Sequence, residues 1–195
     1  MTRPDPALRK ARAEDLAERL AGRPVVLVGM MGAGKTTVGR RLAARLNRPF
    51  LDSDEEIEKA AQMSIPEIFE QRGEPEFRAG ETRVIARVLK TQNVVLATGG
   101  GAFVHPETRA LVKDEAISVW LKAEIDILFE RVSRRSNRPL LKTANPRATL
   151  QKLIDDRYPL YAEADVTVIS RDVPQDAVAA DVVDAVLAFL KQRDT

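Results

Sequence analysis

The chain has 195 residues, of which 44% are hydrophobic and 31% are charged. This composition fits one compact domain and leaves no room for a second full domain. The 31 basic and 29 acidic residues nearly cancel, and the net charge of +2 excludes a polycation that binds nucleic acid or anionic membrane through bulk charge. Because cysteine is absent, disulfides and thiolate metal sites are excluded, a metal would need oxygen ligands, and a reducing cytoplasm is the expected location.

The first 22 residues mix basic and acidic side chains and contain no apolar run of the signal-peptide type. Leucine and alanine recur at near-helical spacing over Ala7–Ala21, which predicts a surface helix. No stretch reaches the roughly 18 apolar residues of a membrane-spanning helix. We therefore expect a helical extension at 1–22, one domain at 23–195, and no membrane partner.

Short apolar runs rich in β-branched residues alternate with helical patterns in the rest of the chain. Strands are predicted at Pro24–Gly29, Pro49–Asp52, Asn93–Thr98, Ala116–Leu121 and Asp165–Ser170. Helices are predicted at Lys35–Leu46, Glu55–Ala61 and Ile65–Leu89, from Glu124 onward, up to about Leu160, and at Asp176–Lys191. This alternation indicates a three-layer α/β/α fold with a five-stranded parallel sheet, whose ligands bind beyond the carboxyl ends of the strands.

The segment Gly29-Met-Met-Gly-Ala-Gly-Lys-Thr36 matches the phosphate-binding pattern G-x-x-x-x-G-K-S/T between a predicted strand and a predicted helix. Its glycines let backbone N–H groups converge on phosphate oxygens, and the helix adds the positive end of its dipole. Lys35 is expected to contact the β- and γ-phosphates of ATP, and Thr36 to give its hydroxyl to Mg²⁺. The predicted nucleotide-binding residues of this loop are Gly32, Ala33, Gly34, Lys35, Thr36 and Thr37.

A magnesium site also needs a carboxylate. The acid that commonly follows a later strand of P-loop proteins is absent, because Val94–Ala97 runs into Thr98-Gly-Gly-Gly101. Residues two apart on a strand project from one face, so Asp52 and Asp54 are both expected to face the phosphates, Asp52 for the metal and Asp54 for the acceptor hydroxyl. The alternative interpretation is a pair of acids that cap the following helix.

Six segments appear in the order seen in shikimate kinases, so residues 24–192 resemble that family. They are GMMGAGKTT, the D-S-D after the second strand, Glu76-Phe-Arg-Ala-Gly-Glu81, Thr98-Gly-Gly-Gly101, Asn137-Arg-Pro-Leu-Leu141 and Asp156-Arg-Tyr-Pro-Leu-Tyr161. The resemblance implies a monomeric P-loop kinase of the chorismate pathway. Such an enzyme transfers the γ-phosphoryl group of Mg-ATP to the 3-hydroxyl of shikimate and releases ADP.

The resemblance also implies roles for individual residues. Arg78 and Arg157 would bind the carboxylate of shikimate, Asp54 would hold the reacting hydroxyl, and Glu81 would orient the pocket. Backbone N–H groups of the glycine run would complete the substrate site. The implied substrate-binding set is Asp54, Arg78, Glu81, Gly99, Gly100, Gly101 and Arg157.

The polar segment 133–147 contains Pro139 and Pro146, which is typical of a mobile lid rather than a packed element. By resemblance, Arg138 in this lid closes over the γ-phosphate, which makes Asp54, Lys35 and Arg138 the implied catalytic residues. Arg131 matches the residue of the family that stacks on adenine.

Two other functions remain open from the residues alone. A gluconate or nucleoside-monophosphate kinase would share the P-loop and lid, although the E-F-R, T-G-G-G and D-R-Y-P-L-Y segments weigh against it. A regulatory module that binds ATP without transferring phosphate is the alternative of another class.

The remaining histidine and aromatic residues are given structural roles. The lone histidine, His105, is interpreted as a loop or helix-start residue, Trp120 as core, and Tyr158 and Tyr161 as packing residues.

Overall fold

The computed structural model describes residues 5–134 and 144–193. Among these residues, five parallel strands form one sheet in the order β2-β3-β1-β4-β5. The strands are β1 (Val25–Val28), β2 (Phe50–Asp52), β3 (Val95–Ala97), β4 (Ile117–Lys122) and β5 (Val166–Ile169). All five predicted strands are present, each within the range expected from the sequence or one residue beyond it.

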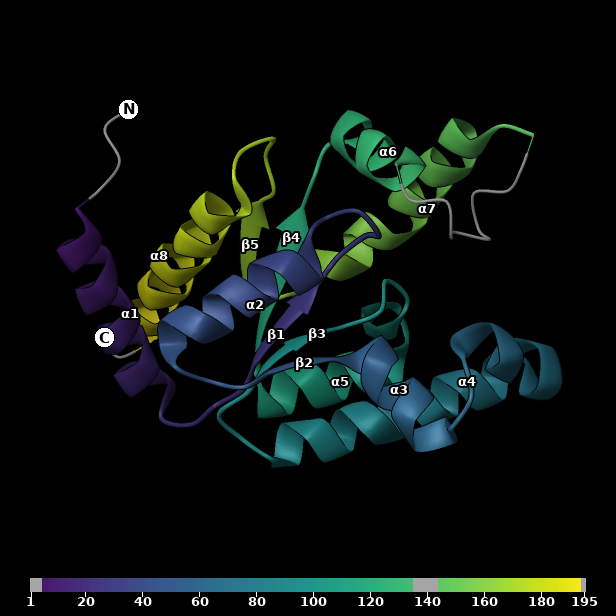
Figure 1. The fold of residues 1–195 in the computed structure, drawn as a ribbon, viewed down its shortest axis with the longest axis horizontal. Coiled ribbons are helices and arrows are strands. Elements are labelled where there is room, and N and C mark those ends of the chain that lie inside the picture. Colours follow the sequence, from purple (N-terminus) through teal and green to yellow (C-terminus); the bar gives the residue numbers. More distant parts are fainter. Residues whose placement is uncertain (1–4, 135–143, 194–195) are drawn as a thin grey trace.

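Helices cover both faces of this sheet, which confirms the three-layer arrangement (Figure 1). The described helices are α1 (Pro6–Leu20), α2 (Lys35–Leu46), α3 (Ser53–Ala61), α4 (Ile65–Lys90), α5 (Pro106–Glu115), α6 (Ile125–Ser133), α7 (Pro146–Tyr161) and α8 (Gln175–Arg193), with a short 3-10 turn at Ala102–Val104. Helices α2 and α8 pack on one face, while α5 packs on the other and contacts α4. None of the described helices is both long and apolar enough to cross a membrane.

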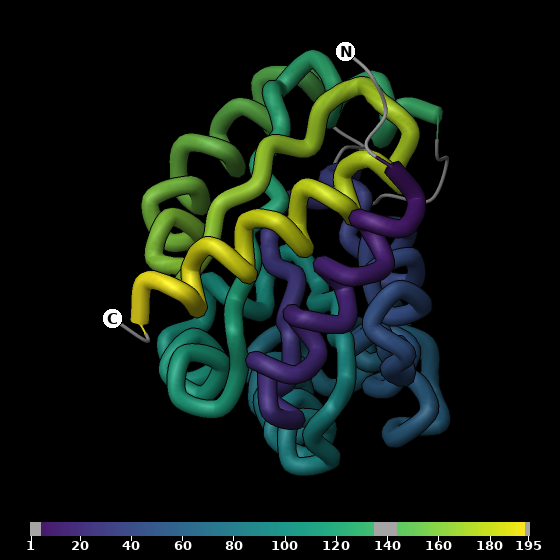
Figure 2. Tube along the Cα trace, turned by 90° about the vertical axis from the view of Figure 1, so that its left-hand side faces the viewer, coloured from purple at the N-terminus to yellow at the C-terminus, as the bar shows by residue number. Residues whose placement is uncertain are grey.

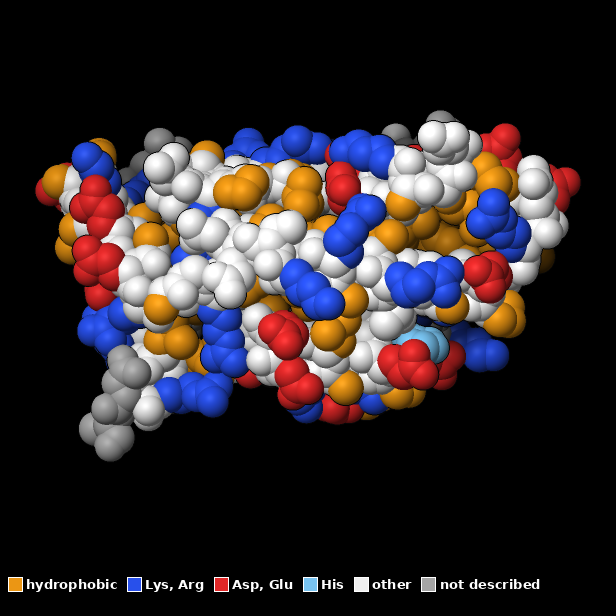
Figure 3. Space-filling view, turned by 90° about the horizontal axis from the view of Figure 1, so that it is seen from below, with side chains coloured by type: hydrophobic (Ala, Val, Ile, Leu, Met, Phe, Trp, Pro, Cys, Tyr) orange, Lys and Arg blue, Asp and Glu red, His pale blue; other side chains and the backbone are white. Residues whose placement is uncertain are grey.

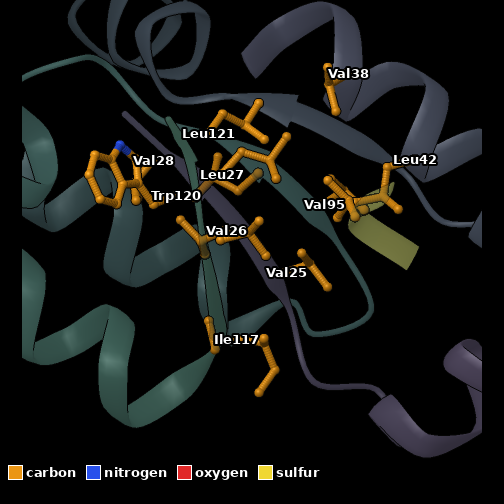
Figure 4. Packing of buried hydrophobic residues seen from close by; sticks show 14 of the residues in the cluster. Val25, Val26, Leu27, Val28, Val38, Leu42, Val95, Ile117, Trp120 and Leu121 are labelled. Carbon is orange, nitrogen blue, oxygen red and sulfur yellow. The ribbon is translucent and has the colours of Figure 1, made fainter. Parts of the chain in front are cut away.

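The central strand β1 is wholly buried because it is flanked by strands and covered by helices. Its four residues Val25–Val28 are at most 1% exposed. Figure 4 shows them packed among Val95, Ile117, Trp120 and Leu121 of neighbouring strands and Val38 and Leu42 of α2. Trp120 is 4% exposed, as expected of a core residue. This rigid core fixes the point where β1 ends and the P-loop begins.

Helix α4 differs from the single helix predicted from its pattern. Gly73 takes φ 77° and ψ 172°, so the chain kinks there, and Pro75 follows two residues later. Proline cannot donate the backbone bond of an uninterrupted helix, and glycine tolerates positive φ. The kink separates the first turns of α4 from the part that presents Arg78 and Glu81.

Helix α1 lies against α8 and α2 (Figure 2). Its inward face consists of Ala13, Leu16 and Leu20, which are at most 3% exposed. The spacing of these three residues follows the helical period from which the helix was predicted. Burial of this face ties α1 to the C-terminal helix at the opposite end of the sequence.

The surface carries interspersed charges, as the net charge suggests. In Figure 3 basic and acidic side chains alternate over the face seen from below, and hydrophobic side chains line a hollow toward one end. On this face the mixed charges form no continuous basic stripe.

Candidate active site

The P-loop places its lysine inside the loop. Lys35 is 9% exposed, and its Nζ donates hydrogen bonds to the carbonyl oxygens of Gly29 at 2.7 Å and Met30 at 2.9 Å. Gly34 has φ +93°, a conformation that side-chain-bearing residues rarely adopt, and it leads directly into the first turn of α2. The ammonium group and the N-terminus of α2 thus form one positive site, which suits polyphosphate.

Asp52 joins this site to the end of β2. Thr36 Oγ1 donates to Asp52 Oδ2 at 2.9 Å, and the backbone N–H of Asp54 donates to Asp52 Oδ1 at 3.1 Å. Asp52 is therefore both the cap of α3 and the partner of the P-loop threonine. The functional and the capping interpretations of the sequence apply to the same carboxylate.

The expected reason for the convergence of the two aspartates was wrong. Asp54 lies in the first turn of α3 and not on β2, because the helix begins at Ser53, two residues before the predicted start. The alternation of a strand therefore does not bring Asp52 and Asp54 together. The tight turn at the cap does so, through the bond between Asp52 and the backbone of Asp54.

A cavity of about 440 Å³ shows which predicted residues meet. It is lined by the P-loop, both aspartates, part of the glycine run and two arginines of α6 and the turn after it. The lining residues are Met31, Gly32, Gly34, Lys35, Thr36, Thr37, Asp52, Asp54, Thr98, Gly99, Gly100, Arg131, Arg134 and Gln175. We call this space the P-loop cavity.

The glycine run after β3 lies directly against the acidic and basic site residues. A Cβ on Gly99 would stand 2.7 Å from Asp54 Oδ1 and 3.1 Å from Glu81 Oε1. A Cβ on Gly101 would stand 2.5 Å from Arg78 Nη2. The lack of side chains in this run is what allows these charged groups to approach the backbone.

Arg78 and Glu81 form an ion pair on α4. Arg78 Nη1 donates to Glu81 Oε2 at 2.6 Å, with Glu81 1% exposed and Arg78 21% exposed. Burial raises the pKa of Glu81 above its usual value, while Arg78 opposes that rise. Glu81 therefore holds the guanidinium of Arg78 in place, as the predicted orienting role requires.

A second cavity, of about 620 Å³, lies on the other side of the glycine run. It is lined by Glu74, Pro75, Arg78, Ala79, Gly101, Val104, His105, Glu107 and Arg157. Both predicted substrate arginines, from α4 and α7, thus face one space that is shared with Gly101. We call this space the arginine cavity.

Arg157 reaches the glycine run from α7. Its Nη1 donates to the carbonyl oxygen of Gly100 at 3.3 Å, and the hydroxyl of Tyr161 donates to the same oxygen. Tyr161 is fully buried, and burial raises its pKa to about 12. The neutral phenol therefore packs and supports the glycine run, in agreement with its predicted packing role.

Arg131 lies beside the P-loop, and its Nη1 donates to the carbonyl oxygen of Gly32 at 3.4 Å. Its Nη1 donates to Ser170 Oγ at 3.0 Å, and its Nη2 donates to the carbonyl of Arg171 at 2.8 Å. These bonds fix the guanidinium at the edge of the P-loop cavity, and its stacking on adenine stays a prediction. Arg138 lies outside the described residues.

Two residues of the site were not predicted from the sequence. Ser53 Oγ accepts the N–H of Gly99 at 2.9 Å, which joins α3 to the glycine run across 46 positions of sequence. Gln175 lines the P-loop cavity from the start of α8.

Helix α5 was not predicted from the sequence. The interpretation of His105 as a helix-start residue is confirmed, because His105 precedes Pro106, the first residue of α5. A proline at the first helical position was the available signal for α5.

The chemistry of the donor set fits a hydrated magnesium ion that is held partly by phosphate. Among the described residues, no group of three or more histidine or carboxylate side chains could hold a metal by itself. One carboxylate and one hydroxyl, those of Asp52 and Thr36, do adjoin the phosphate loop. Mg²⁺ keeps several waters and uses one or two protein oxygens with nucleotide phosphates, so this pair suits it.

Comparisons with known proteins point to one family. A family model described as shikimate kinase matches residues 31–187. A shikimate kinase of Rhodopseudomonas palustris is 57% identical over 182 residues, which cover 93% of this chain and 90% of that protein. A shikimate kinase of Novosphingobium aromaticivorans is 53% identical over 190 residues, which cover 95% of this chain and 98% of that protein.

Solved structures give the same family and separate it from one alternative. A shikimate kinase from Acinetobacter baumannii in complex with shikimate is 42% identical, with a TM-score of 0.81 over 85% of this chain and 93% of that chain. A gluconokinase from Sinorhizobium meliloti is 19% identical, with a TM-score of 0.57 over 87% of this chain and 92% of that chain. The second likeness extends to the fold alone.

Proposed function

The chain belongs to the shikimate kinase family and is an ATP-dependent phosphotransferase, and we propose that ATP binds in its P-loop cavity while shikimate binds in the arginine cavity. The observation that carries this assignment is the position of the glycine run between the two spaces. Gly99 and Gly100 line the P-loop cavity, and Gly101 lines the arginine cavity. Donor and acceptor would therefore meet at the glycine run.

In the proposed mechanism the γ-phosphoryl group passes in line to the 3-hydroxyl of shikimate. Lys35 moves from the loop carbonyls to the β- and γ-phosphates, and backbone N–H groups at the start of α2 bind the β-phosphate. Asp54, beside Gly99, positions the hydroxyl and accepts its proton. The protein acts mainly through positioning and charge.

The carboxylate of shikimate would bind to Arg78 and Arg157. Both line the arginine cavity, and the glycine run leaves their guanidinium groups close to backbone without obstruction. A planar guanidinium suits a carboxylate because two parallel N–H groups can pair with its two oxygens. In the proposed closed state, Arg138 of the lid segment adds positive charge at the γ-phosphate.

Magnesium would be held by Thr36 and Asp52 together with phosphate oxygens. The ion would neutralise charge that builds up on the transferring group. Thr36 and Asp52 fix each other through a hydrogen bond of 2.9 Å, which places hydroxyl and carboxylate oxygens side by side. We also propose that the enzyme acts as a monomer, as the resemblance of its sequence to the family implies.

The test is ADP release with shikimate, gluconate and AMP supplied in parallel at equal concentration. We expect rapid release with shikimate alone, together with a product phosphorylated at the 3-hydroxyl. Faster release with gluconate or AMP would assign the site to another kinase of this fold. Tight ATP binding without release for any acceptor would favour the regulatory module.

A further inference from the structure

His105 places an imidazole in the wall of the arginine cavity, beside Arg78 and Arg157. The residue as a whole is partly exposed, whereas its Nδ1 is buried and has no hydrogen-bond partner among the described residues. A neutral imidazole carries its proton on one nitrogen only. Orphaned N–H groups are rarer inside proteins than orphaned acceptors, so the proton belongs on Nε2, the other ring nitrogen. The accessible edge of the ring therefore presents an N–H donor to the cavity.

The backbone fixes this imidazole close to Gly101. The short 3-10 turn at Ala102–Val104 joins the two residues. The N–H of its last residue donates to the carbonyl oxygen of Gly101 at 3.1 Å, and the N–H of His105 donates to that of its first residue at 3.2 Å. Pro106 restricts the chain on the other side, at the first position of α5. The imidazole is therefore held one turn away from the backbone that the guanidinium of Arg78 approaches.

The two arginines of the cavity are partly engaged by other acceptors. Arg78 donates through Nη1 to Glu81 at 2.6 Å, and its Nη2 lies 3.4 Å from Glu74 Oε1. Arg157 donates through Nη1 to the carbonyl oxygen of Gly100 at 3.3 Å. An ionised carboxylate offers about four lone-pair positions to donors. A carboxylate beside these arginines therefore has room for a further donor.

The charges that line the cavity also favour a specific donor. Glu74 and Glu107 line the same space as Arg78 and Arg157, so the formal charges of these four side chains cancel. An incoming anion is then bound through directed hydrogen bonds more than through a net positive field. His105 supplies such a donor from the wall of the same cavity.

We propose that His105 is a substrate-binding residue of this kinase, whose Nε2–H donates to the carboxylate of shikimate together with Arg78 and Arg157. The inference rests on the proposed binding of shikimate in the arginine cavity. It adds a neutral donor for the acid group to the helix-start role of His105, and it fixes which tautomer the ring adopts.

The first test uses NMR, because the chain contains a single histidine and every imidazole signal of the untagged enzyme belongs to His105. Nitrogen-15 spectra of the ring at mildly alkaline pH distinguish the two tautomers. We expect the Nε2–H tautomer in the free enzyme. Saturation with shikimate should shift the Nε2 resonance more than saturation with ADP does. An Nδ1–H tautomer, or a response to shikimate no larger than that to ADP, would overturn the proposal.

Two amide substitutions then place a donor near one ring nitrogen or the other. The amide nitrogen of glutamine can take the position of Nε2, whereas that of asparagine reaches only as far as Nδ1. His105→Asn should raise the KM for shikimate roughly 3- to 10-fold, the effect of one hydrogen bond, with kcat and the KM for ATP unchanged. His105→Gln should restore most of the affinity. Equal KM values for shikimate in His105→Asn and His105→Gln would overturn the proposal.

The thermal midpoint separates this effect from damage to the fold. His105 is the N-cap of α5 and makes no side-chain capping bond, and asparagine is among the favoured residues at that position. His105→Asn should therefore unfold at a temperature no lower than the wild type does. A rise in KM that appears only with a lowered midpoint would assign the effect to the fold and would contradict the binding role.

The methyl ester of shikimate tests whether the carboxylate is the acceptor. The ester carries no negative charge, and hydrogen bonds to ionised groups are roughly twice as strong as those between neutral groups. The ratio of dissociation constants between His105→Asn and the wild type should therefore be smaller for the ester than for shikimate. Equal ratios would place the imidazole against another group of the ring and would overturn the assignment.

Binding of shikimate measured without ATP separates this inference from the proposed function. If shikimate shifts the Nε2 resonance of His105 but is not phosphorylated when ATP is added, the proposed function fails and the inference stands. If shikimate is phosphorylated while that resonance stays unchanged and His105→Asn keeps the wild-type KM, the inference alone fails.

Discussion

Arg78 is held against the glycine run by Glu81, the residue one helical turn further along α4. The 2.6 Å hydrogen bond between them orients a guanidinium whose Nη2 lies 2.5 Å from the position that a Cβ on Gly101 would take. The carboxylate of Glu81 is buried, so it orients the arginine without itself facing the bulk solvent. The ion pair makes the position of the proposed substrate arginine independent of the substrate.

Replacing Arg78 with alanine should weaken binding of the acid substrate more than it slows transfer. Loss of charge-assisted hydrogen bonds of about 1.5–3 kcal/mol predicts a KM for shikimate that rises roughly 10- to 100-fold. Steady-state kinetics with saturating ATP measures this. Arg83→Ala is the matched control, because Arg83 lies on the same helix, is 68% exposed and pairs with Glu76. A normal KM for Arg78→Ala would place the carboxylate elsewhere.

Gly101→Ala should disturb the same arginine without disturbing the fold. The added Cβ would overlap the guanidinium of Arg78, which is the mobile end of a long side chain and can shift. We expect a raised KM for shikimate, an unchanged KM for ATP, and a thermal midpoint close to that of the wild type. Gly80→Ala serves as control, since its Cβ would meet nothing closer than Arg83 at 3.9 Å. Equal KM values for shikimate in Gly101→Ala and Gly80→Ala would rule out the close approach of Arg78 to Gly101.

Glu81 should make stability fall as pH rises above its ordinary pKa. Burial raises its pKa above 4.5 in the folded protein, so the native state holds this proton more tightly than the unfolded chain does. The resulting contribution is fully present below pH 4.5 and is lost as pH rises through the raised pKa. Glu81→Gln removes the titration, so the unfolding free energy of the wild type should decline relative to that of the variant over this window.

Chemical denaturation of both proteins across that pH range measures the difference. Glu76→Gln on the same helix is the control, because Glu76 is 52% exposed and pairs with Arg83. The unfolding free energy of Glu76→Gln should vary with pH in parallel with that of the wild type. A parallel curve for Glu81→Gln as well would mean that its pKa is not raised on folding.

Asp52→Asn should raise the magnesium requirement. The variant keeps the shape of the cap but loses the negative charge beside Thr36, and residues that support a metal commonly change its affinity by roughly 10- to 100-fold. The magnesium concentration for half-maximal rate should rise by a factor in this range. Asp155→Asn, which affects a pair with Gln151 on the surface of α7, should leave it unchanged. An unaltered magnesium dependence in Asp52→Asn would remove the carboxylate from the metal site.

Local patterns were sufficient to predict the strands and the P-loop from the sequence. The apolar run Val25–Val28 and the glycine-lysine pattern after it each specify their structure within a few residues, and α2 begins and ends where it was predicted. The parallel sheet then brings residues at its carboxyl edge together. Asp52, Gly99 and Lys35 could therefore be assigned to one site without coordinates.

The remaining site residues depend on contacts between distant segments, which no local pattern encodes. The bond from Gly99 to Ser53 and that from Tyr161 to Gly100 each join different elements, and the contact of Gln175 with Gly34 crosses most of the chain. The kink at Gly73 was missed although the sequence signals it, because Gly73 and Pro75 interrupt the helical pattern between Phe69 and Phe77. For Asp54 the predicted location held, although the strand geometry from which it was predicted did not.

The most direct test of the account is the Asp54→Asn variant, measured for both turnover and ATP affinity. If Asp54 positions the hydroxyl and accepts its proton, kcat for shikimate should fall by about 10²-fold or more, while the Kd for ATP stays near the wild-type value. Glu55→Gln, the exposed neighbour that pairs with Arg40, should retain full turnover. An Asp54→Asn enzyme with an unimpaired kcat would contradict the central claim that this carboxylate acts on the acceptor hydroxyl.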